Sequence, residues 1–244
     1  MHHPPTTVSR TEDDLAQLLA SPPVRPSGEV GGDALLLAAR SHGIVPLLSA
    51  GLAAHGDVPG APSMPELTRI ARGEALNVAV QDVVLERALA ALRDAEIPAL
   101  VLKGGALAQT HYSNPHLRPR IDTDVLVPPR DYERAIAALE RSGFERLASL
   151  DSSLLLRQAP LVLRQPNGLQ GIIDLHREIS NRPAYLGVLA FDQLLADCQT
   201  VPFGEHGFQA PGDVHALILA CVHLLGHHGN APRLIWLYDI VALA

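Results

Sequence analysis

Three aspartates that lie inside apolar, strand-like runs constrain this chain more than any other feature of its sequence. Asp122 and Asp124 belong to the run RIDTDVLV, and Asp174 belongs to GIIDLH. Side chains two residues apart in a strand project from the same face, so we expect the first two carboxylates side by side. Like charges buried on one sheet repel each other and lose their hydration. One or two divalent cations that prefer oxygen ligands, Mg²⁺ or Mn²⁺, would remove that cost.

The neighbouring residues leave a second interpretation open. Each aspartate could instead end a strand and pair with an arginine, because Arg118, Arg120 and Arg177 are all close in sequence. We favour phosphate binding for Arg118 and Arg120, since metal ions would already neutralise the acids. His176 follows Asp174 by two residues and shares its strand face, which makes it a further active-site candidate, with a surface position as the alternative.

A glycine-containing turn precedes the aspartate pair. The run IPALVLKGG predicts a strand that ends in Gly104 and Gly105 and leads into a helix over 106–111. Two glycines there let the backbone approach a phosphate, with N–H groups and a helix N-terminus directed at it; a plain tight turn is the alternative. Lys103 is the only lysine among 19 basic residues. All the other basic residues are arginines, so this lysine indicates a position that requires a compact ammonium group rather than a planar guanidinium. We therefore predict that Lys103 is one of the phosphate ligands.

Helical patterns flank these strand-like runs on both sides. The predicted helices cover 13–20, 33–54 (bent at Gly43 and Pro46), 64–95, 130–142, 188–197, 212–228 and 232–244. Ser63 and Glu66 have the spacing of a capping box at the start of the third of these helices. The run PLVLRQPNGLQGIIDLHREI predicts a hairpin that turns at Pro166–Asn167–Gly168.

This order of elements predicts an α+β fold rather than a regularly alternating one. We divide the chain into an N-terminal tail and helical region (1–63), a core (64–185) and a C-terminal helical region (186–244). The last region stops in the middle of an apolar helical pattern, so we expect it to be a truncated or short form.

Composition and charge exclude several classes of protein. Hydrophobic residues make up 47% and charged residues 18% of the 244 residues, which excludes a disordered chain. No apolar run approaches the roughly 20 residues that cross a bilayer, and the first residues lack the apolar segment of a secretory signal. A net charge of −7 argues against a broad nucleic-acid-binding face. With only two cysteines, Cys198 and Cys221, we expect a cytoplasmic protein.

The run LVLKGGALAQTHYSNPHLRPRIDTDVLV, followed by IIDLH, resembles the polymerase-β-type nucleotidyltransferase superfamily. More narrowly, it is similar to an uncharacterised bacterial branch with the pattern LKG…Y…RP..D.D.LV. ARSHGIVPLL and VHLLGHHGNAPRLIWLYDIVAL resemble other parts of that branch, so the resemblance covers about 33–244. It implies a nucleotidyltransferase core, a small mixed sheet with flanking helices, over 64–185. The superfamily's usual turn is Gly-Ser, whereas here the second residue is Gly105, and we expect Lys103 to compensate for the missing hydroxyl.

The resemblance implies a Mg²⁺-dependent enzyme that transfers an NMP from an NTP, such as ATP, to an acceptor. Gly104 and Gly105 would hold the triphosphate, and Asp122 and Asp124 would ligate two metal ions. Asp174 would complete the catalytic ion's shell and help to deprotonate the attacking group. The acceptor could be a small molecule, a protein or an RNA end, and an oligomer could form through the N-terminal helices. The alternative is a nucleotide-binding regulatory or interaction module without catalysis.

The C-terminal helices carry a histidine cluster whose role the sequence leaves open. His223, His227 and His228 could bind zinc, line a cleft or face solvent. On the predicted helix the apolar stripe consists of Val214, Leu217, Ile218, Cys221 and Leu225, which places His223 and His227 opposite the buried face. Tyr112 and Trp236 could stack on a base or belong to the core. Asp239 is polar on an apolar helix, so we expect it to pair with an arginine or to cap a cleft residue.

Overall fold

One mixed sheet organises the residues that the computed structural model describes, which are 10–20, 31–56, 58–147, 157–227 and 233–244. Within them, seven strands follow the order β3-β4-β5-β2-β1-β7-β6. Their bounds are β1 Leu100–Val101, β2 Thr123–Leu126, β3 Glu145–Arg146, β4 Gln158–Arg164, β5 Gln170–His176, β6 Cys198–Val201 and β7 Phe208–Pro211. The central pair β2 and β5 is parallel, as is β1 with β7, and the remaining neighbours are antiparallel.

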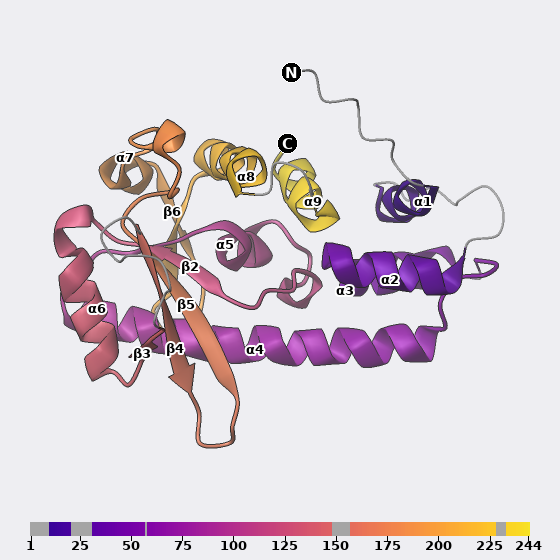
Figure 1. Ribbon diagram of the computed structural model, residues 1–244, viewed down its shortest axis with the longest axis horizontal. Coiled ribbons are helices and arrows are strands. Elements are labelled where there is room, and N and C mark those ends of the chain that lie inside the picture. The colour runs from indigo at the N-terminus through magenta and orange to yellow at the C-terminus, as the bar shows by residue number, and fades with distance from the viewer. Residues whose placement is uncertain (1–9, 21–30, 57, 148–156, 228–232) are drawn as a thin grey trace.

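Helices surround this sheet, so the predicted α+β class, a mixed sheet between flanking helices, is confirmed (Figure 1). Their bounds are α1 Arg10–Leu19, α2 Gly32–His42, α3 Val45–His55, α4 Met64–Asp94, α5 Lys103–Thr110, α6 Tyr132–Arg141, α7 Phe191–Ala196, α8 Asp213–His227 and α9 Leu234–Leu243. Short 3₁₀ turns lie at Pro115–Leu117, Pro129–Asp131 and Pro183–Tyr185. None of the described helices is long and apolar enough to cross a membrane.

The two faces of the sheet bury alternate residues of the same strands, as a strand with a period of two must. Val101 and Val125 face a core formed with α4 and α6. Leu100 and Leu126 face a second core formed with α7 and α8. Strands β1 and β2 are therefore buried on both faces, which explains why the sequence around them is largely apolar.

The N-terminal helices form a third core with the rest of the chain. Buried leucines of α1, α2 and α3 pack around the start of α4, together with Tyr112 and the α9 residues Ile235 and Trp236. Figure 1 shows these helices at one end of the long helix α4, with the sheet at its other end. Helix α4 thus connects the N-terminal helices to the sheet.

Several predicted elements differ in the structure. The helix predicted over 33–54 is two helices, because Gly43 ends α2 in a left-handed conformation (φ 68°) and a new helix begins at Val45, with Pro46 in its first turn. The capping box at Ser63 does not form, since the Ser63 side chain makes no capping hydrogen bond. The helix predicted to begin at 106 begins at Lys103. The antiparallel pair β6–β7 lies between the helices predicted over 188–197 and 212–228, where we predicted no strand.

Candidate active site

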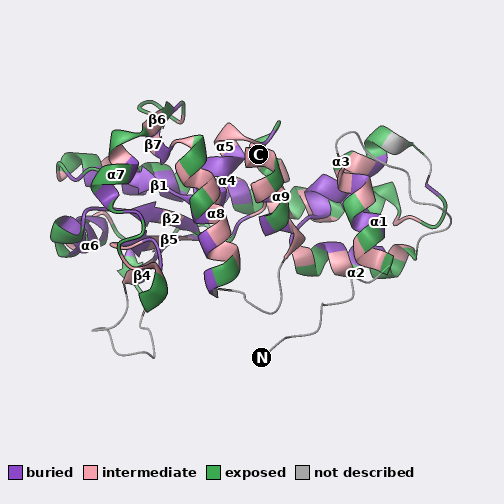
Figure 2. Cartoon of the chain, turned by 90° about the horizontal axis from the view of Figure 1, so that it is seen from above, coloured by how far each residue is buried: buried purple, intermediate pink, exposed green. Residues whose placement is uncertain are grey.

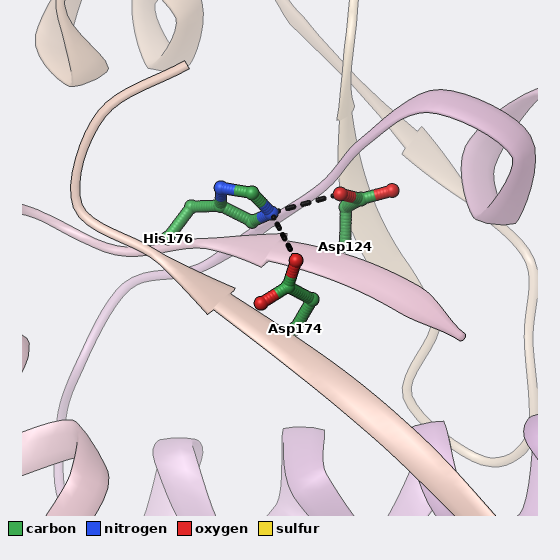
Figure 3. Close-up of side chains that lie close together, drawn as sticks. All are labelled: Asp124, Asp174 and His176. Carbon is green, nitrogen blue, oxygen red and sulfur yellow. Dashed lines mark hydrogen bonds and ion pairs between the residues drawn. The ribbon is translucent and has the colours of Figure 1, made fainter. Parts of the chain in front are cut away.

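The predicted aspartates meet where β2 and β5 run side by side. Asp124 and Asp174 are direct partners in the register of these parallel strands, and Asp122 immediately precedes β2. Adjacent parallel strands place register partners on the same face of the sheet, so the two carboxylates lie close together. His176, two residues after Asp174, points to the same place, as the sequence predicted (Figure 3).

Two basic side chains hold this acidic cluster together. Lys103 Nζ donates to Asp124 Oδ1 at 2.6 Å, and His176 Nε2 lies 2.8 Å from the same oxygen. His176 Nε2 also lies 3.4 Å from Asp174 Oδ2 and so bridges the two carboxylates (Figure 3). The other oxygen of Asp174, Oδ1, is buried and has no hydrogen-bond partner among the described residues.

Burial and these contacts shift the pKa values of Asp122, Asp124 and His176 in different directions from their ordinary values. Loss of hydration, then repulsion by Asp124 and Asp174, raises the pKa of Asp122 to about 6. Burial alone would raise the pKa of Asp124, but Lys103 and His176 outweigh burial and hold that pKa well below its usual range. Burial alone would lower the pKa of His176, yet its hydrogen bonds to Asp124 and Asp174 raise it to about 9.

The donor set fits a hard divalent cation. Ligand atoms of Asp124, Asp174 and His176 all lie within 4.8 Å of one another. The unpartnered Asp174 Oδ1 supplies a carboxylate oxygen, the type of ligand that Mg²⁺ and Mn²⁺ prefer. The raised pKa of Asp122 reflects, in part, repulsion between carboxylates that a cation would relieve. Asp124, Asp174 and His176 are therefore the residues whose ligand atoms lie close enough to hold such an ion. Asp122 lines the same cavity but is not part of that group, so its role as a ligand stays a prediction.

The two glycines of the LKGG run are buried in the first turn of helix α5 and line the cavity at the aspartates. A Cβ on Gly104 would lie 2.9 Å from Arg118 Nη2, and one on Gly105 would lie 2.8 Å from Thr123 Cγ2. At Gly105 the neighbour is the short, buried Thr123 side chain, so close packing favours glycine there. At Gly104 a Cβ would require the end of the Arg118 side chain to shift. Lys103 itself adopts a left-handed backbone (φ 49°), which non-glycine residues rarely do outside tightly constrained sites.

The two predicted phosphate-binding arginines are buried and engaged elsewhere. Arg118 donates from Nε and Nη2 to Asp239 at 2.8 and 2.7 Å, and Arg120 forms an ion pair with Asp82. The expectation that Asp239 pairs with an arginine is confirmed. Arg118 and Arg120 still line the cavity, but the ion pairs that the structure gives them join them to acids outside the aspartate cluster.

The predicted buried face of helix α8 is wrong. Val214, Ile218 and Leu225 are exposed, whereas Leu219 and Val222 are buried against the sheet. Figure 2 shows exposed, intermediate and buried residues alternating along α8. Apolar residues occupy most positions of α8 and lie on all sides of the helix, so a helical wheel does not select the buried side.

Because α8 buries a different side from the predicted one, its histidines lie in a different environment from the one we expected. His223 lines the cavity and its ring meets Trp236 edge-on at 5.3 Å. Trp236 is buried and lines the same cavity. The His227 side chain and His228 lie outside the described residues.

Residues of the long helix α4 support the cluster, and the sequence analysis missed them. Gln81 is buried, donates to the Ile121 carbonyl and accepts from the Ile172 amide at 3.3 Å, so it joins the beginnings of the two aspartate-bearing segments. The sequence feature that could have indicated Gln81 is a single amide side chain within the apolar stripe of this helix. Glu74 and Asn77, one to two turns earlier, line a cavity of about 570 Å³ that extends from the aspartates.

The sequence of this chain matches one known protein family. A family described as uncharacterised nucleotidyltransferase matches residues 28–244. A search among curated proteins found no match.

Three solved structures resemble the chain at low sequence identity. The antigenic nucleotidyltransferase-like protein from Paracoccidioides brasiliensis is 16% identical, with a TM-score of 0.46 over 68% of this chain and 74% of that one. The antibiotic-resistance factor ANT(2'')-Ia is 12% identical, with a TM-score of 0.46 over 68% and 83%. The lincosamide antibiotic adenylyltransferase LnuA is 13% identical, with a TM-score of 0.43 over 67% and 96%.

Proposed function

Because this chain belongs to the uncharacterised nucleotidyltransferase family, we propose that it transfers an NMP from an NTP to an acceptor at the aspartate cluster. The observation that carries the proposal is the register pair Asp124–Asp174, which lies beside the first turn of helix α5. Carboxylates on adjacent strands facing a helix N-terminus combine a cation site with a phosphate site.

We assign Asp122, Asp124 and Asp174 to two divalent ions, Mg²⁺ or Mn²⁺. When bound, such ions stabilise the attacking and leaving oxygens of an in-line displacement. Lys103 and His176 hold Asp124 in place and offset the charge of the three acids. The N–H groups of Gly104 and Gly105, with the positive end of helix α5, would bind the triphosphate.

The reaction forms one bond and breaks one at the α-phosphorus. The acceptor oxygen bonds to phosphorus while the bond to the pyrophosphate oxygen breaks, so pyrophosphate leaves. The acceptor's proton passes to a base, and Asp174 is our candidate because its carboxylate belongs to the cluster and lines the cavity.

An assay of pyrophosphate release and label transfer, with each of the four α-labelled NTPs and with Mg²⁺ or Mn²⁺, tests the proposal. We expect pyrophosphate release or label transfer by the wild type and none by Asp122→Asn. Asp94→Asn is the matched control, because Asp94 is an exposed carboxylate at the end of α4. Full activity in Asp122→Asn would refute the assignment, and tight NTP binding without any release would favour the non-catalytic module.

A further inference from the structure

The cavity has a second end, away from the aspartates, which no step of the proposed reaction uses. We call it the distal site and define it by the lining residues Arg40, Glu74, Asn77, Arg233 and Trp236. These residues come from helices α2, α4 and α9 and the residue before α9, whereas the aspartates come from the sheet. The N-terminal and C-terminal helices therefore build a polar site that opens into the same space as the cluster.

Glu74 lies on the cavity side of helix α4 with Asn77, three residues later on the same helical face. Its Oε2 is buried and accepts no hydrogen bond from the described residues. Loss of hydration raises the pKa of Glu74, and the charges of Arg40 and Arg233 only partly oppose this shift. A buried carboxylate oxygen without a partner is costly, and a ligand that donates a hydroxyl would satisfy it.

Arg233 is held in position independently of any ligand. Its Nε donates to the Ser41 carbonyl at 3.0 Å, and its guanidinium lies over the Trp236 ring at 5.6 Å from the centroid. Arg40 is exposed on α2 at the same end of the cavity. Two guanidinium groups and one carboxylate thus line this end of the cavity.

The sign of charge differs between the two ends of the cavity. Arg118 and Asp239, which also line it, form a buried ion pair and cancel each other. The distal site therefore keeps a net positive formal charge among its described residues, opposite to the acidic cluster. Arginine recognises phosphate and carboxylate groups through paired hydrogen bonds.

We propose that the distal site binds the acceptor, and that the acceptor is a small molecule carrying an anionic group, phosphate or carboxylate, close to a hydroxyl. Arg40 and Arg233 bind the anionic group, and Glu74 accepts the hydrogen bond of a hydroxyl. This inference rests on the proposed function, because it assumes that the NTP occupies the aspartate end.

Trp236 provides a direct test, because it is the only tryptophan of the chain. Its fluorescence is recorded while inorganic phosphate, acetate or ethanolamine is added to the protein, both free and saturated with Mg²⁺ and a non-hydrolysable NTP analogue. We expect a saturable change with phosphate or acetate in both states and none with ethanolamine; the better of the two anions identifies the acceptor's anionic group. Arg40→Gln should weaken that binding roughly 10- to 100-fold, and the exposed Arg141→Gln on α6 should leave it unchanged.

Three results would overturn the inference. The first is the absence of any saturable change with either anion, and the second is unchanged anion binding in Arg40→Gln. The third is anion binding that the nucleotide analogue abolishes, since the distal site would then hold the phosphates of the NTP. Calorimetry of wild-type protein with Mg²⁺ and NTP separates the two proposals: no NTP binding contradicts the proposed function, while titration of the free protein still tests the distal site.

Discussion

Gly105→Ser places the side chain that is usual in the superfamily into this chain, and we expect it to destabilise the fold. A Cβ at position 105 would lie 2.8 Å from Thr123 Cγ2 and 3.1 Å from Val101 Cγ1. Gly105, Val101 and Thr123 are all buried, so none of them can move into solvent. Overpacking of this kind costs about 1–3 kcal/mol, which corresponds to a fall in melting temperature of roughly 2–12 °C for a chain of this size.

Urea and thermal unfolding measure this cost, and a second substitution tests its cause. Thr123→Ser removes Cγ2 and keeps the hydroxyl that accepts from Arg120 Nε at 3.3 Å. The double variant with Gly105→Ser should therefore recover at least half of the lost stability, which is a coupling that independent sites do not show. Gly73→Ala is the control: nothing lies within 4 Å of the added Cβ, and alanine in mid-helix should add up to about 1 kcal/mol.

A serine variant as stable as the wild type, or a double variant that Thr123→Ser does not rescue, would show that packing does not require Gly105. A gain in NTP affinity in Gly105→Ser would also contradict the packing explanation. The absent hydroxyl would then be a missing phosphate ligand, and packing would not explain the glycine.

Three further predictions concern residues around the site. Asp239→Asn leaves the Arg118 guanidinium buried without its counter-ion, so urea unfolding should show a loss of about 3–5 kcal/mol; a loss below about 1 kcal/mol would contradict a buried ion pair. Because the pKa of Asp122 is raised to about 6 and a metal ligand must be deprotonated, Mn²⁺ affinity by calorimetry should rise between pH 5 and pH 7 and then level off; the same rise in Asp122→Asn would refute this. Gln81→Leu leaves two backbone groups of the aspartate-bearing segments unpaired, which should cost about 1–3 kcal/mol in equilibrium unfolding; wild-type stability would show that the contacts are dispensable.

The convergence of Asp124, Asp174 and His176 could be predicted from the sequence, because each interrupts or ends an apolar run and the period of a strand is two. The hairpin β4–β5 also follows from sequence, since Pro166–Asn167–Gly168 provides a turn between two apolar runs. The identity of the arginine partners could not be predicted. Arg118 finds Asp239 more than a hundred positions away, and only the docking of helix α9 brings them together.

Three features escaped sequence reasoning for physical reasons. The strands β6 and β7 are four residues each and mix polar with apolar side chains, so neither carries a clear alternation. Helix α5 begins at Lys103 because tertiary packing overrides the low helix propensity of two glycines. The distal site joins Arg40 of α2, Glu74 of α4 and Arg233, which precedes α9, and no local sequence pattern links them.

The most direct test of the account counts the Mn²⁺ ions that the protein binds together with a non-hydrolysable NTP analogue, by electron paramagnetic resonance. We expect two ions per wild-type chain in the presence of the analogue. We expect a loss of at least one ion in Asp124→Asn and Asp174→Asn, and no change in the exposed Asp94→Asn. Wild-type occupancy in both cluster variants would contradict the claim that these carboxylates hold the ions of a nucleotidyltransferase site.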